Sequence, residues 1–265
     1  MQTDYVQELV AILERLRGPG GCPWDREQTH DSLKRFLIEE CGELLDALDD
    51  RDDTAIVDEL GDVLLQLVFH CQIGKEEGRF CLQDAARSEC EKMIRRHPHV
   101  FGDQSADTPA AVVDQWDRLK RNEERHAAKV SALDGIPRHL PALHRAQVAL
   151  RKAGKTGFEW PDLAGALAKV REEIAEVEEA CHGGQREHIA EELGDLLLAV
   201  VNLCRWHQFE AEDLLQQSVR KFVRRFQRLE ETFRQQGRVM AECTGDELAR
   251  AWRATADPAP SAPTA

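Results

Sequence analysis

Apolar residues recur along most of the chain at the three- and four-residue spacing of amphipathic helices. This periodicity predicts helices over residues 5–16, 32–48, 54–71, 82–96, 109–127, 163–181, 189–206, 211–235 and 245–252. No segment shows the alternation of apolar and polar residues that is typical of a half-buried strand. The pattern therefore predicts an all-α fold.

Turn-forming residues divide the predicted helices into two groups. Residues 131–141 contain Asp134, Gly135 and two prolines, a composition that favours a loop. We therefore predict a first helical domain over residues 1–130, a linker over 131–141 and a second helical domain over 142–256. Residues 257–265 are rich in proline and alanine, and we expect this tail to be disordered.

Composition narrows the possible functions. The net charge of -14 disfavours nucleic acid as a partner, because an acidic surface repels the phosphate backbone. A phosphorylated small molecule can still bind if metal ions bridge it to the protein. None of the eight cysteines forms a CxxC pair, so a zinc knuckle is not indicated. No apolar run approaches the length of a membrane span, and we expect a reduced, cytoplasmic protein without a membrane partner.

An acidic pattern occurs twice. In the first half the sequence Glu39-Glu40-Cys41-Gly42-Glu43 is followed by Glu59-Leu60-Gly61-Asp62, and in the second half Glu172-Glu173-Ile174-Ala175-Glu176 is followed by Glu192-Leu193-Gly194-Asp195. All five acidic positions share one offset, and a Gly-x-x-Trp precedes each block. We interpret this pattern as an internal repeat.

Helix geometry brings these acids together. Glu40 and Glu43 share one face of their helix, as do Glu59 and Asp62, because residues three apart are neighbours on a helix. Packing the two helices through their apolar stripes would gather four or five carboxylates, whose repulsion raises their pKa values unless a cation intervenes. Oxygen ligands without histidine or cysteine suit Mg²⁺ or Mn²⁺.

Acidic residues on helices more often form a solvated face, and either block alone would favour that interpretation. Two observations favour a metal site instead. No basic residue lies within residues 39–50 or 172–180 to pair with the acids, and the same constellation occurs twice in register.

At these residues the chain resembles the MazG family of nucleoside triphosphate pyrophosphohydrolases, whose pattern is E-E-x-x-E, a spacer, then E-x-x-D. Segments 20–25, 95–101 and 131–137 are also similar to tandem-repeat members of the family. The resemblance extends from Gly20 to Trp252. It implies an all-α fold of two tandem repeats, with homodimers that form four-helix bundles.

The resemblance further implies that nucleoside triphosphates, ribo or deoxy, are cleaved between the α- and β-phosphates to a nucleoside monophosphate and pyrophosphate. It implies that Mg²⁺ is held by Glu173, Glu176, Glu192 and Asp195, and in the first half by the equivalent Glu40, Glu43, Glu59 and Asp62. Catalysis would fall to Glu172, Glu173 and Glu176, with Glu172 assisting or positioning water. Tandem members are expected to concentrate activity in the second half.

A triphosphate also needs cations from the protein. Lys221, Arg224 and Arg225 follow the second acidic block on one helix, and Lys169 precedes that block by less than a turn. These residues are either phosphate ligands or a basic stripe on the surface, and together with the repeat they favour phosphate binding. Trp252 resembles the base-contacting position of the family and could stack on a nucleobase.

Three alternatives compete with this interpretation. A non-enzymatic helical assembly module would use the acids only as a solvated face. A di-iron carboxylate bundle needs Glu-x-x-His on two helices, which neither acidic block supplies. A related phosphohydrolase restricted to one deoxynucleotide would share the acidic pattern, because base and sugar choice depend on pocket walls built by several helices.

Overall fold

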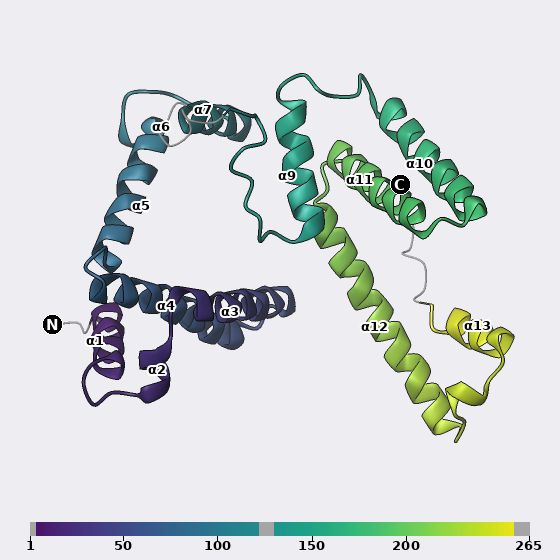
Figure 1. Ribbon diagram of the computed structural model, residues 1–265, viewed down its shortest axis with the longest axis horizontal. Coiled ribbons are helices and arrows are strands. Elements are labelled where there is room, and N and C mark those ends of the chain that lie inside the picture. The colour runs from purple at the N-terminus through teal and green to yellow at the C-terminus, as the bar shows by residue number, and fades with distance from the viewer. Residues whose placement is uncertain (1–3, 122–129, 257–265) are drawn as a thin grey trace. The chain divides into compact units, whose positions relative to one another are not determined.

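The computed structural model describes residues 4–121 and 130–256, and all regular structure in these two ranges is helical (Figure 1). The predicted all-α fold is therefore confirmed. The chain divides between Ala127 and Ala128 into two compact units, each described by itself below. Residues 122–127 of the fifth predicted helix and the predicted disordered tail lie outside the described ranges.

The first unit contains seven helices in the part that is described. They are α1 (Tyr5–Arg17), α2 (Pro23–Glu27), α3 (His30–Asp50), α4 (Asp53–Glu76), α5 (Leu82–Arg96), α6 (Pro98–Phe101) and α7 (Pro109–Arg121). The periodicity predicted the longer helices but not α2 and α6, because helices of about one turn are too short to repeat an apolar face.

Helices α3 and α4 form the central pair of this unit, which we call the first helix pair. Thr29 and Ser32 cap the start of α3 reciprocally, and the Asp52 carboxylate accepts two backbone N–H groups at the start of α4. Only two residues join the helices, so the pair is antiparallel (Figure 1). The core beneath it consists of Leu13, Leu33, Val68, Phe69 and Ile73.

The second unit repeats this arrangement. It contains α9 (Ala142–Gly154), α10 (Leu163–Gly183), α11 (Arg186–Trp206), α12 (Ala211–Gln235), the 3-10 helix η1 (Met240–Glu242) and α13 (Gly245–Ala254). The periodicity did not predict α9 or η1. Gly184 ends α10 with a positive φ of 69°, a backbone conformation that favours glycine, and α11 returns along α10 as the second helix pair.

The two helix pairs are in the same register as the acidic repeat. Helices α10 and α11 begin 133 positions after α3 and α4, which is also the offset between the matching acids. The sequence repeat therefore corresponds to a structural repeat.

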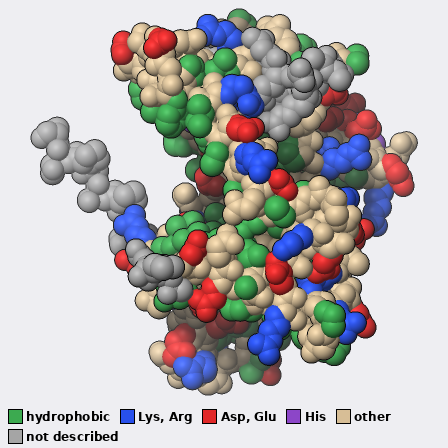
Figure 2. Space-filling model, turned by 90° about the vertical axis from the view of Figure 1, so that its left-hand side faces the viewer, with side chains coloured by type: hydrophobic (Ala, Val, Ile, Leu, Met, Phe, Trp, Pro, Cys, Tyr) green, Lys and Arg blue, Asp and Glu red, His purple; other side chains and the backbone are tan. Residues whose placement is uncertain are grey.

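Both units leave apolar side chains exposed, and patches of them lie among charged side chains on the face drawn in Figure 2. On α11 and α12 these residues follow helical spacing: Leu193, Leu197, Val200, Leu215, Val219, Phe222 and Phe226. Across the described ranges, no helix has both the length and the apolar character needed to cross a membrane.

Candidate metal and nucleotide site

The first helix pair brings carboxylates together. Oxygen atoms of Glu40, Glu43 and Glu59 all lie within 4.8 Å of one another, and we call these residues the first carboxylate cluster. Burial raises the pKa of Glu40 and of Glu59, and neighbouring carboxylates raise both further, with Asp62 acting on each. The predicted first-half acids are thus close enough to repel one another strongly.

The second helix pair forms an equivalent group. Oxygen atoms of Glu173, Glu192 and Asp195 lie within 4.8 Å of one another and make up the second carboxylate cluster. Glu173 is buried, with 4% of its surface exposed. Glu176 lies next to this cluster rather than within it, and its pKa is raised mainly by burial and also by Glu173.

Both clusters fit a divalent cation. The Oε2 atoms of Glu59 and Glu173 are buried and have no hydrogen-bond partner in the described structure. A buried carboxylate oxygen without a partner costs free energy unless a cation or a donor satisfies it. The ligand atoms on offer are all carboxylate oxygens, which suit Mg²⁺ or Mn²⁺ rather than a softer metal.

A lysine enters the second cluster. The Lys169 Nζ lies 2.6 Å from Glu172 and 2.8 Å from Glu173, and these hydrogen bonds raise the pKa of Lys169 above its ordinary value. His188 also approaches, with its Nδ1 3.3 Å from Glu192. The sequence interpretation named Lys169 as a phosphate ligand but not as a partner of the acids. It looked for pairing bases only within each acidic block, whereas Lys169 precedes its partners by three and four positions.

The basic residues predicted for phosphate binding separate into two places. Lys221 and Arg224 line a hollow of about 520 Å³ along α12. Arg225 does not line that hollow. Its guanidinium lies 4.2 Å from the centre of the Trp252 ring and donates a hydrogen bond of 3.1 Å to the Trp252 carbonyl. Arg225 and Trp252 therefore join α12 to α13.

Trp252 also contacts Phe222, with ring centroids 5.4 Å apart. Helix α13 packs on α12 at the opposite end from the second helix pair (Figure 1). Within a single chain, the Trp252 ring therefore contacts Phe222 and Arg225 of α12. The first unit has a similar contact, in which the buried Arg96 lies 5.2 Å from the centre of the Trp116 ring.

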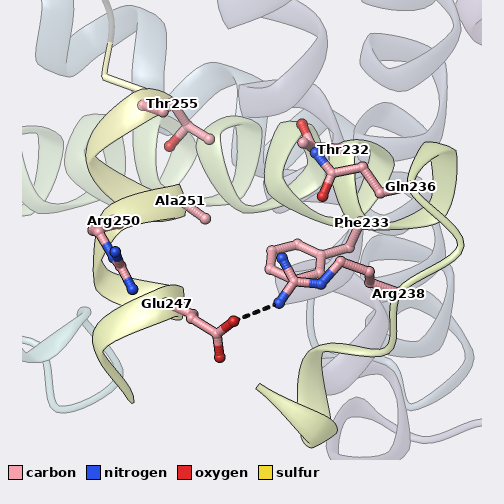
Figure 3. Close-up of a pocket in the computed structure, with 9 residues that line it drawn as sticks. Thr232, Phe233, Gln236, Arg238, Glu247, Arg250, Ala251 and Thr255 are labelled. Atoms are coloured by element: carbon pink, nitrogen blue, oxygen red, sulfur yellow. Dashed lines mark hydrogen bonds and ion pairs between the residues drawn. The ribbon is translucent and has the colours of Figure 1, made fainter. Parts of the chain in front are cut away.

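A second hollow, of about 450 Å³, lies between α12 and α13 (Figure 3). Arg238 projects into it, pairs with Glu247 at 2.9 Å and lies over the Phe233 ring (Figure 3). None of the site residues predicted from the sequence lines this hollow. It therefore does not connect the carboxylate clusters with Lys221, Arg224 or Arg225.

Comparison with known families agrees with the repeat. The model of the MazG nucleotide pyrophosphohydrolase domain matches the chain twice, over residues 28–101 and 164–229. Each match contains one helix pair with its carboxylate cluster. The chain belongs to the MazG family. The resemblance on which the sequence interpretation relied is thereby confirmed.

Named relatives cover almost the whole MazG chain. It is 44% identical over 246 residues to the nucleoside triphosphate pyrophosphohydrolase/pyrophosphatase MazG of Thermotoga maritima, a match that covers 93% of each chain. It is 40% identical over 253 residues to a nucleoside triphosphate pyrophosphohydrolase of Escherichia coli, covering 94% of this chain and 96% of the relative. Within this MazG chain, Lys221, Arg224 and Arg225 fall inside the second domain match and Trp252 falls beyond it.

Proposed function

We propose that this chain hydrolyses nucleoside triphosphates, ribo or deoxy, between the α- and β-phosphates, releasing a nucleoside monophosphate and pyrophosphate. The observation that carries the proposal is the convergence of Glu173, Glu192 and Asp195 within 4.8 Å inside a MazG domain. The names of the relatives from Thermotoga maritima and Escherichia coli support the same reaction.

Mg²⁺, with Mn²⁺ as a substitute, would be held in the second unit by Glu173, Glu192 and Asp195 with Glu176 beside them. The equivalent ligands in the first unit would be Glu40, Glu43, Glu59 and Asp62. When bound, Mg²⁺ supplies positive charge that neutralises the phosphate oxygens and the leaving pyrophosphate.

The remaining roles belong to side chains around the second cluster. Glu176 is half-buried and its raised pKa brings it closer to neutral pH, which suits a group that takes a proton from the attacking water. Glu172 is exposed beside it and would orient that water. Lys169 would turn from the carboxylates to a phosphate oxygen, since its ammonium group can serve either anion.

The base and the remaining phosphate oxygens of the nucleotide must be bound by residues outside the second carboxylate cluster. Lys221 and Arg224 on α12 would bind phosphate oxygens, and Arg225 would hold Trp252 where it can stack on a base. We infer a homodimer with a four-helix bundle, because α11 and α12 expose apolar residues at helical spacing that a second copy would cover. The second copy would also bring its own α12 and α13 to the site.

A product assay tests the reaction. The purified protein would be incubated with each common ribo- and deoxynucleoside triphosphate, with and without Mg²⁺, and the products separated by anion exchange. Monophosphate plus pyrophosphate, formed only with the metal, is expected. Diphosphate plus phosphate would refute the cleavage position, and no turnover of any nucleotide would favour the non-enzymatic assembly module.

A matched pair of variants tests which unit acts. Glu59 and Glu192 occupy the same position of the two repeats. We expect Glu192→Gln to abolish turnover and Glu59→Gln to retain it. The reverse result would move the catalytic site to the first unit. Size-exclusion chromatography with light scattering on the same samples measures whether the chain is a dimer.

A further inference from the structure

The two units share all five acids of the repeated pattern but differ at two other positions of the repeat. Lys169, which enters the second cluster, corresponds to Phe36 in the first unit, 133 positions earlier. Conversely, Gln66 of the first unit corresponds to Ala199 of the second. The second unit therefore has a lysine that the first unit lacks, and the first unit has an amide that the second unit lacks.

In the first unit, the residue at the lysine position turns to the core. Phe36 packs against the buried apolar cluster, its ring meets Trp24 edge-on with centroids 5.8 Å apart, and Arg35 lies over its ring. The strongest charged influences on the pKa of Glu40 and Glu59 are all carboxylates. No side chain that the structure describes supplies this cluster with an ion pair comparable to that of Lys169.

The side chain of Gln66 is a second indication that a cation binds at the first carboxylate cluster. Gln66 is buried, with 7% of its surface exposed, and it donates a hydrogen bond to the Glu40 carboxylate. Its own Oε1 is buried without a partner in the described structure. This oxygen belongs to a buried side chain that already reaches Glu40 of the first carboxylate cluster, and a hard divalent cation bound there would give it a partner.

In the second unit, a divalent metal ion must compete with the ammonium group of Lys169 for the carboxylates. Lys169 already holds two carboxylates, one of them the buried Glu173, and the alanine at position 199 offers no ligand. A metal at this cluster must share Glu173 with Lys169, and the positive charge of the lysine weakens metal binding until the lysine moves away. The phosphates of a nucleotide offer the lysine a replacement partner, which makes the exchange favourable when metal and nucleotide arrive together.

We propose that the two clusters load differently: the first unit binds a divalent cation without nucleotide, whereas the second unit binds its cation together with the nucleotide that draws Lys169 away. This inference rests on the proposed function for its second half. The cation of the first unit is then a resident part of the fold, and that of the second unit is a part of the substrate complex.

Binding of Mn²⁺ alone to the full-length chain, followed by electron paramagnetic resonance, tests the first half. Without nucleotide, one tight Mn²⁺ per chain is expected. Glu43→Gln should lose it, its repeat partner Glu176→Gln should keep it, and Gln66→Ala should weaken it. Lys169→Met should make a second Mn²⁺ bind about tenfold tighter than in the wild type, because the resident ion pairs are gone.

Nucleotide dependence is tested with a triphosphate whose α–β bridging oxygen is replaced by methylene, which resists the proposed cleavage. This analogue should add a second tight Mn²⁺ to the wild type and change little in Lys169→Met. The inference is overturned if Glu176→Gln rather than Glu43→Gln loses the nucleotide-independent Mn²⁺, or if Lys169→Met leaves Mn²⁺ affinity unchanged.

The product assay separates this inference from the proposed function. Turnover of triphosphates together with two equal Mn²⁺ sites in the nucleotide-free wild type would refute only the inference. Absence of turnover together with the expected first-unit Mn²⁺ would refute the proposed function and leave the resident cation site standing. Circular dichroism of each variant establishes that lost Mn²⁺ binding is not lost folding.

Discussion

We expect the main role of Arg225 to be structural, because it holds α13 against α12. Its guanidinium lies 4.2 Å from the centre of the Trp252 ring and donates to the Trp252 carbonyl, so one side chain contacts both the ring and the backbone of α13. Replacing it by methionine removes both interactions while keeping a long apolar side chain. We predict that Arg225→Met loosens α13 from α12.

The size of the effect follows from these two contacts. A partly buried cation over a tryptophan ring contributes about 0.5–2 kcal/mol, and a hydrogen bond from a charged donor about 1.5–3 kcal/mol. Against this, the variant removes the buried Nε of Arg225, which has no partner in the described structure. A net loss of about 1–3 kcal/mol would raise the opening equilibrium of α13 about 5- to 150-fold.

Hydrogen exchange of the amides in α13 measures this opening directly. Arg224→Met is the matched control, because Arg224 is the preceding residue, lines the hollow on α12 and is not the residue that contacts Trp252. Faster exchange of α13 is expected in Arg225→Met and not in Arg224→Met, although both should raise KM. Unchanged protection of α13 in Arg225→Met would refute the reasoning.

Three further outcomes are expected. Glu176→Gln should lose turnover and keep its helical circular dichroism, because an amide of the same size cannot take a proton from water. Burial and the adjacent His30 lower the pKa of His70 from its ordinary 6.5, so the unfolded chain takes up a proton first and the free energy of unfolding should fall as pH drops below 6.5, measured by urea unfolding. Arg17→Met should cost about 2–4 kcal/mol in the same experiment, because it removes the donor of the Asp25 and Gln28 carbonyls as well as the ion pair with Glu76.

Each outcome has a comparison that can contradict it. Persistent turnover in Glu176→Gln would mean that the second-unit cluster is not catalytic, and Glu43→Gln would then be assayed. A His70→Gln variant with the same pH dependence of unfolding as the wild type would show that His70 is not its source. Arg15→Met, an exposed change two positions from Arg17, should cost less than about 0.5 kcal/mol, and an equal cost in both variants would contradict the role of the Arg17 pair.

The all-α fold and its internal repeat could be predicted from the sequence because both depend on local rules. Residues on the apolar face of a helix recur at a fixed spacing. Acids three or four positions apart share a face of the helix independently of tertiary contacts. The shared offset of five acids therefore predicted two equivalent helix pairs, and α10 and α11 do begin where that offset requires. Short helices such as α2 and α6 escaped prediction because one turn has no period.

The surroundings of the first carboxylate cluster were decided by the tertiary structure. Packing of α4 on α3 brings the buried Gln66 to Glu40, and Phe36 turns to the apolar core. The Lys169 pairs of the second unit, in contrast, join residues three and four apart on α10 and follow from spacing along one helix. The sequence grouped Arg225 with Lys221 and Arg224, and the docking of α13 directs it to Trp252 instead. Spacing along one helix specifies which residues share a face, whereas the partner of that face depends on segments distant in sequence.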